Sequence, residues 1–107
     1  MSLNLSIVEY LIEQSKIRLE RNGINFTIEC SENVAIFDEL DSLEKEELIS
    51  ITALYLLGGD DVFNMQSARQ QAENLGYDAV NLLAFAPDLG DRLERGCTFI
   101  IDNSDQQ

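Results

Sequence analysis

The segment Leu48–Leu57 constrains the fold of this chain more than any other feature of its sequence. Eight of its ten residues are apolar, and at helical spacing they fall on every side of the helix. A helix that is apolar all round is usually the buried centre of a domain or one half of an oligomer interface. Gly58 and Gly59 follow directly and end it. We therefore expect this helix to lie at the centre of the fold or in an oligomer contact.

Before this segment, the sequence predicts one helix and one region with two interpretations. Apolar residues at three- and four-residue spacing predict a helix over residues 6–21, which Asn22-Gly23 ends. Residues 24–30 alternate apolar and polar side chains, which is typical of a strand. Val34–Phe37 either pair with that strand in a short β-hairpin over residues 24–37 or begin a helix.

Acidic residues mark the expected starts of the next two helices. Asp41 or Ser42 is expected to cap the central helix, with Glu44 three residues after Asp41 as in a capping box. The pair Asp60-Asp61 is expected to supply the cap of a third helix, which ends at Gly76. The inner face of that third helix is expected to consist of Met65, Ala68, Ala72 and Leu75.

Two more helices complete the prediction. Asp78 caps a short helix over residues 79–85, and Pro87 ends it and begins the last helix. The last helix runs out near Asp102, before a polar tail over residues 103–107 that we expect to be disordered. With 107 residues, the chain is expected to form one mainly α domain over residues 1–107. Its predicted architecture is a compact bundle of four to five helices, with the hairpin left open. The buried face of the last helix is expected to consist of Leu89, Leu93, Cys97 and Ile100.

The charge of the chain limits what it can bind. Twenty acidic and seven basic residues give a net charge of −13, and eight of the acids lie between Glu29 and Glu47. Binding to nucleic acid or to an anionic membrane through a basic surface needs clustered lysine and arginine, which this chain lacks. A charged partner is therefore expected to be a basic protein.

The sequence lacks the features of a secreted or membrane-spanning chain. It does not open with a basic segment and an apolar run, and no stretch approaches the ~20 apolar residues of a membrane span. Cys30 and Cys97 are too few and too far apart for a metal-binding pattern, and the chain has no histidine. We expect a cytoplasmic protein with two reduced thiols in its core, and a disulfide between them is left open.

Two motifs together resemble a known family. A leucine-rich helix closes in Gly58-Gly59-Asp60, and Leu82-Leu83 precedes the pattern Pro87-x-Leu89-Gly90-Asp91-x-Leu93-Glu94-x-Gly96. These residues, with the opening Leu3-Asn4-Leu5, resemble a small bacterial domain family of unknown function. The resemblance spans most of the chain. It implies a short, mostly helical protein with no assigned activity, and it supplies no catalytic residues.

One group of acids invites a metal-site hypothesis. Asp88, Asp91 and Glu94 are helix neighbours at three-residue spacing and would offer oxygen ligands to a divalent cation. Arg92 and Arg95 lie between them, which favours ion pairs on a solvated helix face instead. We therefore expect no catalytic, cofactor-binding or metal-binding residues, and we keep Asp88, Asp91 and Glu94 as weak candidates for a cation site.

Gly90 and Gly96 lie inside the last helix, where each costs about 1 kcal/mol of helix stability relative to alanine. This cost indicates close approach of a neighbouring backbone, which belongs either to another helix of this chain or to a second copy. With the apolar central helix, these glycines define the candidate interface. Its residues are Leu54, Tyr55, Gly90, Leu93 and Gly96.

The sequence favours binding over catalysis. It has no histidine to act as a general base and no nucleophile motif around any serine. We therefore expect a non-catalytic domain that binds another protein or a second copy of itself. One alternative is an acidic mimic of nucleic acid, which would use the run Glu29–Glu47 to inhibit a DNA- or RNA-binding protein. A metal-dependent enzyme that uses Asp88 or Asp91 is less favoured.

Overall fold

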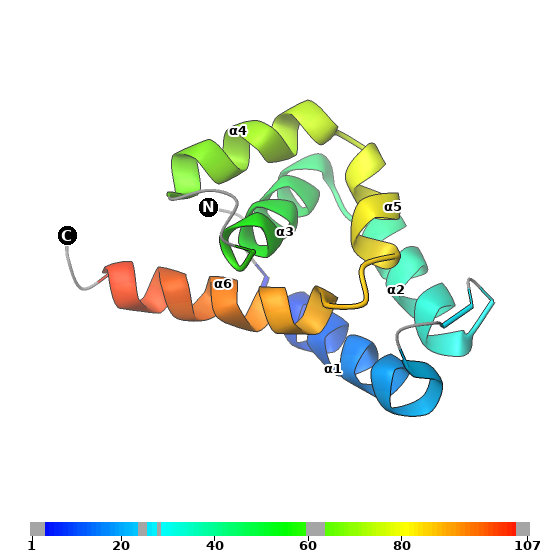
Figure 1. Cartoon of the computed structure of the whole chain (residues 1–107). Coiled ribbons are helices and arrows are strands. Elements are labelled where there is room, and N and C mark those ends of the chain that lie inside the picture. Colours follow the sequence, from blue (N-terminus) through cyan, green and yellow to red (C-terminus); the bar gives the residue numbers. More distant parts are fainter. Residues whose placement is uncertain (1–3, 24–25, 28, 60–63, 105–107) are drawn as a thin grey trace.

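A computed structural model describes residues 4–23, 26–27, 29–59 and 64–104, with side chains as far as residue 100. These residues form six helices, so the mainly α class is confirmed and the predicted number of four to five helices is too low (Figure 1). The additional helix comes from residues that the sequence analysis assigned to a hairpin or to a helix start. The helices are α1 (Leu5–Asn22), α2 (Ser31–Asp41), α3 (Lys45–Leu57), α4 (Met65–Leu75), α5 (Asp78–Ala84) and α6 (Leu89–Ser104).

Helix α3 lies at the centre of the fold, as its sequence predicts. Every residue from Leu48 to Leu57 is buried, including Ser50 and Thr52. Helices α4, α5 and α6 pack against α3, while α1 packs against α6 and α2 (Figure 1). The apolar surface on all sides of α3 is therefore covered by other helices of the same chain, which is the first of the two outcomes expected for such a helix.

The hairpin over residues 24–37 is wrong, because its second half forms helix α2. Asn33, Ile36 and Leu40 are buried at three- and four-residue spacing, so α2 turns one helical face toward the core. Residues 24, 25 and 28 lie outside the described residues, and the described part of the chain contains no strand. The alternation over residues 24–30 is a local pattern, whereas joint burial of Asn33, Ile36 and Leu40 at spacings of three and four residues fits a helix and not a strand.

The predicted helix ends are confirmed more often than the predicted starts. Gly23 and Gly76 end α1 and α4 with φ angles of 70° and 56°, which favour glycine. Asp41, however, is the last residue of α2, and α3 begins at Lys45 after Glu44. Asn64 caps α4, because its side-chain Oδ1 accepts a hydrogen bond of 2.8 Å from the backbone N–H of Ser67.

Asp60 and Asp61, the caps expected for α4, lie outside the described residues. Asp78 is the first residue of α5 rather than its cap. Helix α6 continues through Ser104, so the predicted tail is helical at residues 103 and 104, and residues 105–107 lie outside the described residues.

Close backbone contacts at glycines fix the position of α6. A Cβ atom added at Gly96 would overlap the carbonyl oxygen of Leu54 on α3, and one added at Gly58 would overlap the carbonyl oxygen of Arg92 on α6. Gly96 therefore makes room for α3, and Gly58 makes room for α6. Gly58 lies four residues after Leu54, and Gly96 lies four residues after Arg92. Gly90 lies against α1, where an added Cβ would be 3.2 Å from the carbonyl oxygen of Ile12.

This packing predicts that Gly96→Ala destabilises the protein, whereas the same change in an exposed helix would stabilise it. Overpacking against Leu54 should cost about 1–3 kcal/mol and exceed the ~1 kcal/mol that alanine adds in helix propensity. Urea unfolding followed by circular dichroism measures the change in the free energy of unfolding.

Gly90→Ala is the matched control, because it carries the same gain in propensity but faces atoms no closer than 3.2 Å. We expect its loss of stability to be smaller than that of Gly96→Ala. Gly96→Ala protein as stable as the wild type would contradict the close packing of α3 and α6.

Candidate functional site

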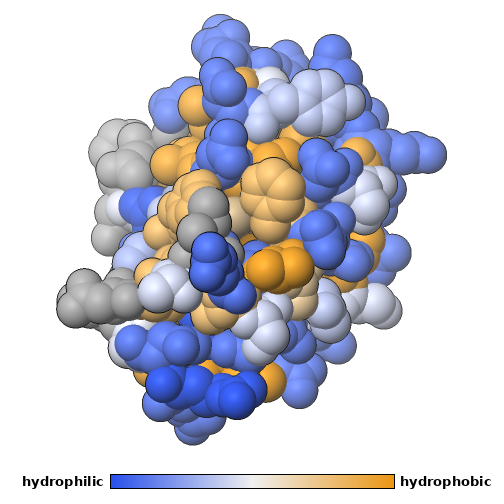
Figure 2. All heavy atoms as spheres, turned by 90° about the vertical axis from the view of Figure 1, so that its right-hand side faces the viewer, coloured by the Kyte–Doolittle hydropathy of each residue, from blue (hydrophilic) through white to orange (hydrophobic). Residues whose placement is uncertain are grey.

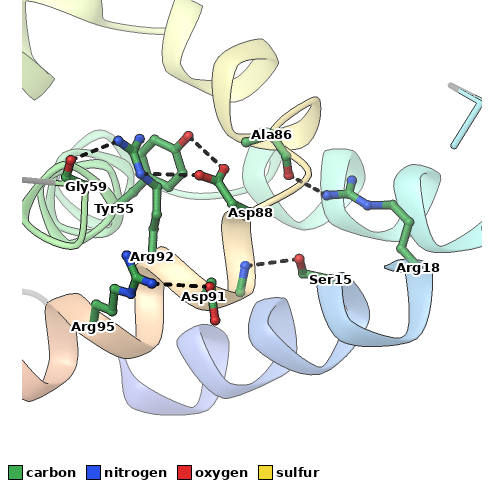
Figure 3. A network of polar contacts seen from close by, with 10 residues as sticks. Ser15, Arg18, Tyr55, Gly59, Ala86, Asp88, Asp91, Arg92 and Arg95 are labelled. Carbon is green, nitrogen blue, oxygen red and sulfur yellow. Dashed lines mark hydrogen bonds and ion pairs between the residues drawn. The ribbon is translucent and has the colours of Figure 1, made fainter. Parts of the chain in front are cut away.

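The three carboxylates proposed as cation ligands each face a different base. Asp88 Oδ2 lies 3.5 Å from Nε of Arg92, and Asp91 Oδ2 lies 3.7 Å from Nη2 of Arg95 (Figure 3). Glu94 forms an ion pair with Lys16 of α1. Among the described residues, no group of three or more acids, cysteines or histidines is placed to hold a metal ion. The geometry at these positions is that of ion pairs along α6.

Tyr55, a candidate interface residue, belongs to a polar network at the start of α6. Its hydroxyl donates to Asp88 Oδ1 at 3.4 Å, and the guanidinium carbon of Arg92 lies 4.3 Å from the centre of its ring (Figure 3). Burial raises the pKa of the Tyr55 hydroxyl, against the opposing effect of the Arg92 charge. Arg92 also donates to the carbonyl oxygen of Gly59 at 3.4 Å. Tyr55 thus links α3 to the start of α6.

The other candidate interface residues also lie inside the chain. Leu54 and Leu93 are fully buried, and Gly90 and Gly96 contact α1 and α3 respectively. Contacts within one chain therefore explain why positions 90 and 96 are glycine. This is one of the two explanations that the sequence left open. These residues are not at the surface of the monomer, so a binding surface has to be sought elsewhere.

A fully buried arginine, which the sequence analysis did not single out, joins three elements. Nη1 of Arg18 donates to Asn33 Oδ1 at 3.0 Å and to the carbonyl oxygen of Ala84 at 2.7 Å, and Nη2 donates to that of Ala86 at 2.6 Å. Its guanidinium also lies 3.8 Å from the centre of the Phe26 ring. The carbonyl of Ala84, the last residue of α5, has no partner within the helix, and the carbonyl of Ala86 follows in the connection to α6. Arg18 from α1 donates to both.

The burial of Arg18 has an electrostatic cost. It lowers the pKa of the guanidinium, while the negative charge of Glu32 acts in the opposite direction. No acceptor among the described residues reaches its Nε. Three hydrogen bonds and an aromatic contact offset this cost, and all of them are used within the fold. Arg18 therefore holds α1, α2 and the end of α5 together rather than offering a site to a ligand.

The acidic run Glu29–Glu47 does not form one continuous charged surface. Glu32 is buried and accepts hydrogen bonds from Ser31 Oγ at 2.6 Å and from Asn22 Nδ2 at 3.2 Å. It also forms an ion pair of 3.2 Å with Arg21. Glu46 pairs with Arg69 of α4 at 2.9 Å. Two of the eight acids in this run are therefore neutralised by bases of the chain itself.

Both cysteines are free thiols and half-buried. Cys97 packs against the core from α6, as its place in the apolar stripe predicts. Burial raises the pKa of the Cys97 thiol, and the negative charges of Glu94 and Glu9 raise it further. Since the thiolate is the nucleophilic form, these effects disfavour reactivity at Cys97.

A groove on the surface between α1 and α6 is the feature that sequence reasoning missed. It has a volume of about 760 Å³. We call its apolar lining residues, Ile12, Ile17 and Leu19, the floor and its carboxylates the margin. A second hollow of about 280 Å³ adjoins it at Lys16 and Leu19 and reaches Pro87 and Asp91. The residues that line the main groove are Glu9, Ile12, Glu13, Lys16, Ile17, Leu19, Glu20 and Glu94.

The margin of this groove carries a net negative charge. Glu9, Glu13 and Glu20 come from α1, and no described base forms an ion pair with any of them. Among the other bases, Arg18 is buried, four arginines pair with acids outside the groove, and Lys45 lies at the start of α3. The glutamates at positions 9 and 13 are like charges four residues apart, which repel each other along the helix.

A signal for this groove exists in the sequence. Glu9, Glu13, Lys16 and Glu20 follow one another at spacings of four, three and four residues, which places them on one face of α1. The groove itself requires α6 beside them, and the periodicity of α1 does not show which helix lies there.

A second surface with apolar side chains lies over α2 and α5. Val34 on α2 is 45% exposed, and Leu82 on α5 and Phe85 just after it are exposed to a similar degree. Figure 2 shows the side of the molecule that carries these helices, with apolar residues at the centre and hydrophilic residues around them.

No protein-family model, curated protein or solved structure matches this chain. Its resemblance to a small bacterial domain family therefore stays a prediction. In the part of the chain that the structure describes, no helix is both long enough and apolar enough to cross a membrane.

The environment of Glu32 predicts a specific pH dependence of stability. The hydrogen bond from Ser31, helped by the Arg21 charge and the Asn22 amide, lowers the pKa of Glu32 in the folded state despite the effect of burial. Its ionised form therefore stabilises the fold above the unfolded-state pKa of about 4.3, and this contribution is lost as the pH falls through the folded-state pKa.

We expect Glu32→Gln to be less stable than the wild type at neutral pH and the difference to shrink in acid. Urea unfolding of both proteins at neutral pH and near pH 3 measures it. In a Ser31→Ala background the pH-dependent part of the difference should be smaller. An equal difference at both pH values would contradict the lowered pKa.

Proposed function

We propose that this protein is a non-catalytic interaction module that binds a basic, amphipathic segment of another protein in the groove between α1 and α6. The observation that carries the proposal is the combination of an apolar floor with glutamates along its margin that form an ion pair with no described base. Apolar side chains of a partner would cover the floor, and its lysines or arginines would reach the margin. A helix laid in an apolar groove is a common way to recognise such a segment.

The length of the acidic stripe indicates the size of the partner segment. Glu9 and Glu20 are eleven residues apart on α1, which corresponds to about 16 Å along the helix at a rise of ~1.5 Å per residue. A partner helix of about three turns would span this distance. Its basic residues would follow at three- and four-residue spacing, like the acids they face.

Electrostatics favour a basic partner over a second copy of this chain. The chain carries a net charge of −13, so self-association through the groove would bring more acids toward Glu9, Glu13 and Glu20. A basic segment would instead relieve the repulsion between those glutamates. Complementary charge also speeds encounter between partners, and this effect weakens as salt screens it.

The alternative of an acidic nucleic-acid mimic has less support. It would use the run Glu29–Glu47, where Glu32 and Glu46 already pair with Arg21 and Arg69. The groove on α1 brings apolar side chains and acids together in one hollow, and Glu9, Glu13 and Glu20 form an ion pair with no described base. We therefore treat the mimic as an outcome that the following experiment can reveal.

The test uses a synthetic peptide of about 18 residues, roughly 27 Å long as a helix. Leucines on one face and lysines on both margins make the peptide a probe for the groove. Fluorescence anisotropy near physiological ionic strength measures its affinity for the protein. Each exposed carboxylate should contribute about 0.5 kcal/mol, so Glu9→Gln/Glu13→Gln should weaken binding about three- to tenfold.

Glu39→Gln/Asp41→Asn is the matched control, since it removes the same charge from the end of α2. We expect this control to bind the peptide within about twofold of the wild type, because its charges lie away from the groove and are screened. A peptide with the same composition in scrambled order should bind more weakly, since it has no apolar face. Equal weakening by the two protein variants would refute the groove, and weakening by the control alone would favour the mimic.

A further inference from the structure

We propose that Lys16 is a built-in competitor that holds, at Glu94, the place of one basic side chain of the partner. This inference rests on the proposed function of the groove and adds what limits binding of the partner at Glu94. Lys16 extends from α1 to the carboxylate of Glu94 on α6, so their ion pair spans the two helices that form the groove. A partner cation can bind Glu94 only after the ammonium of Lys16 leaves.

The position of Lys16 in the sequence supports this role. It stands between Glu13 and Glu20 on the face of α1 that also carries Glu9, where it is the one basic residue in the stripe. The spacing of four, three and four residues is continuous through position 16. An acid at position 16 would make the stripe an uninterrupted row of acids, and Lys16 takes that position.

Exposure makes the pair easy to open. The side chains of Lys16 and Glu94 are 60% and 47% exposed, so solvent screens their attraction. Ordering a long lysine side chain also costs entropy, which lowers the net strength of the pair. Both features differ from the environment of the buried Arg18, whose hydrogen bonds hold three elements of the fold together.

Lys16 also lies at the junction of the two hollows. It lines the main groove and the adjoining hollow that reaches Pro87 and Asp91, and Leu19 is shared in the same way. When Lys16 moves away from Glu94, the two hollows present one longer acidic surface. The partner is therefore expected to carry one cation for Glu94 and further cations for Glu9 and Glu13.

Lys16→Met tests the inference, because methionine keeps an unbranched apolar chain and removes the charge. We expect the variant to bind the basic amphipathic peptide about two- to fivefold more tightly than the wild type, within the range of one exposed ion pair. The matched control is Lys45→Met, which changes the net charge equally at the start of α3, outside the groove. We expect Lys45→Met to change the affinity for the peptide by a smaller factor than Lys16→Met does.

A double variant separates this role from a general change of charge. In a Glu94→Gln background, Lys16→Met should give a smaller gain, because the carboxylate for which the two cations compete is absent. An equal gain in both backgrounds, or an equal gain from Lys45→Met, would overturn the competitor role.

The same measurements distinguish this inference from the proposed function. If Glu9→Gln/Glu13→Gln weakens peptide binding while Lys16→Met leaves it unchanged, the groove stands and the competitor role is wrong. If neither the wild type nor Lys16→Met binds the peptide, both proposals are wrong.

Discussion

The contact between Gly96 and the backbone of Leu54 fixes the place of α6, and the surface features of this protein depend on that place. Only a glycine lets the two helices come this close, and Gly58 gives α3 the same freedom against Arg92. With α6 held in this way, Arg92 lies over the ring of Tyr55, and the glycine at position 90 reaches α1. Ser15 Oγ of α1 accepts a hydrogen bond of 3.0 Å from the backbone N–H of Gly90, which satisfies one of the first donors of α6 (Figure 3).

A second constraint acts about one turn further along α1, at Arg18. Arg18 is fully buried and donates to the last carbonyl of α5, to the carbonyl of Ala86 just after that helix, and to Asn33 of α2. The start of α6 follows α5 after only a short connection, so the end of α5 and the start of α6 are both tied to α1. The groove therefore lies between two helices whose positions are set by contacts within the fold. A surface held in this way suits recognition, because little order has to be imposed when a partner binds.

Much of the fold was predictable because its strongest signals are apolar patterns that only burial explains. The apolar residues on all sides of Leu48–Leu57 predicted a buried helix. The apolar stripe that starts with Leu89 and Leu93 predicted an inner face for α6. Gly23 and Gly76 ended their helices where the sequence indicated. The hairpin was wrong because a local alternation competed with the burial of α2, and the choice depends on the rest of the fold.

The candidate site was less predictable, because its properties arise from pairing between distant segments. Whether Asp88 and Asp91 bind a cation or pair with Arg92 and Arg95 depends on side-chain geometry, which spacing alone does not decide. The role of Arg18 depends on carbonyls more than sixty residues away. The groove likewise needs both α1 and α6, although the stripe of glutamates on α1 is visible in the sequence.

The most direct test of the central claim is to map where the basic amphipathic peptide binds. Two-dimensional NMR spectra of the labelled protein, recorded during a titration, report a change at each backbone amide. We predict binding in the groove, with changes that cluster on residues 9–20 of α1 and on the first turns of α6, Gly90 among them. Changes that cluster instead around Val34, Leu82 and Phe85, or along Glu29–Glu47, would contradict it.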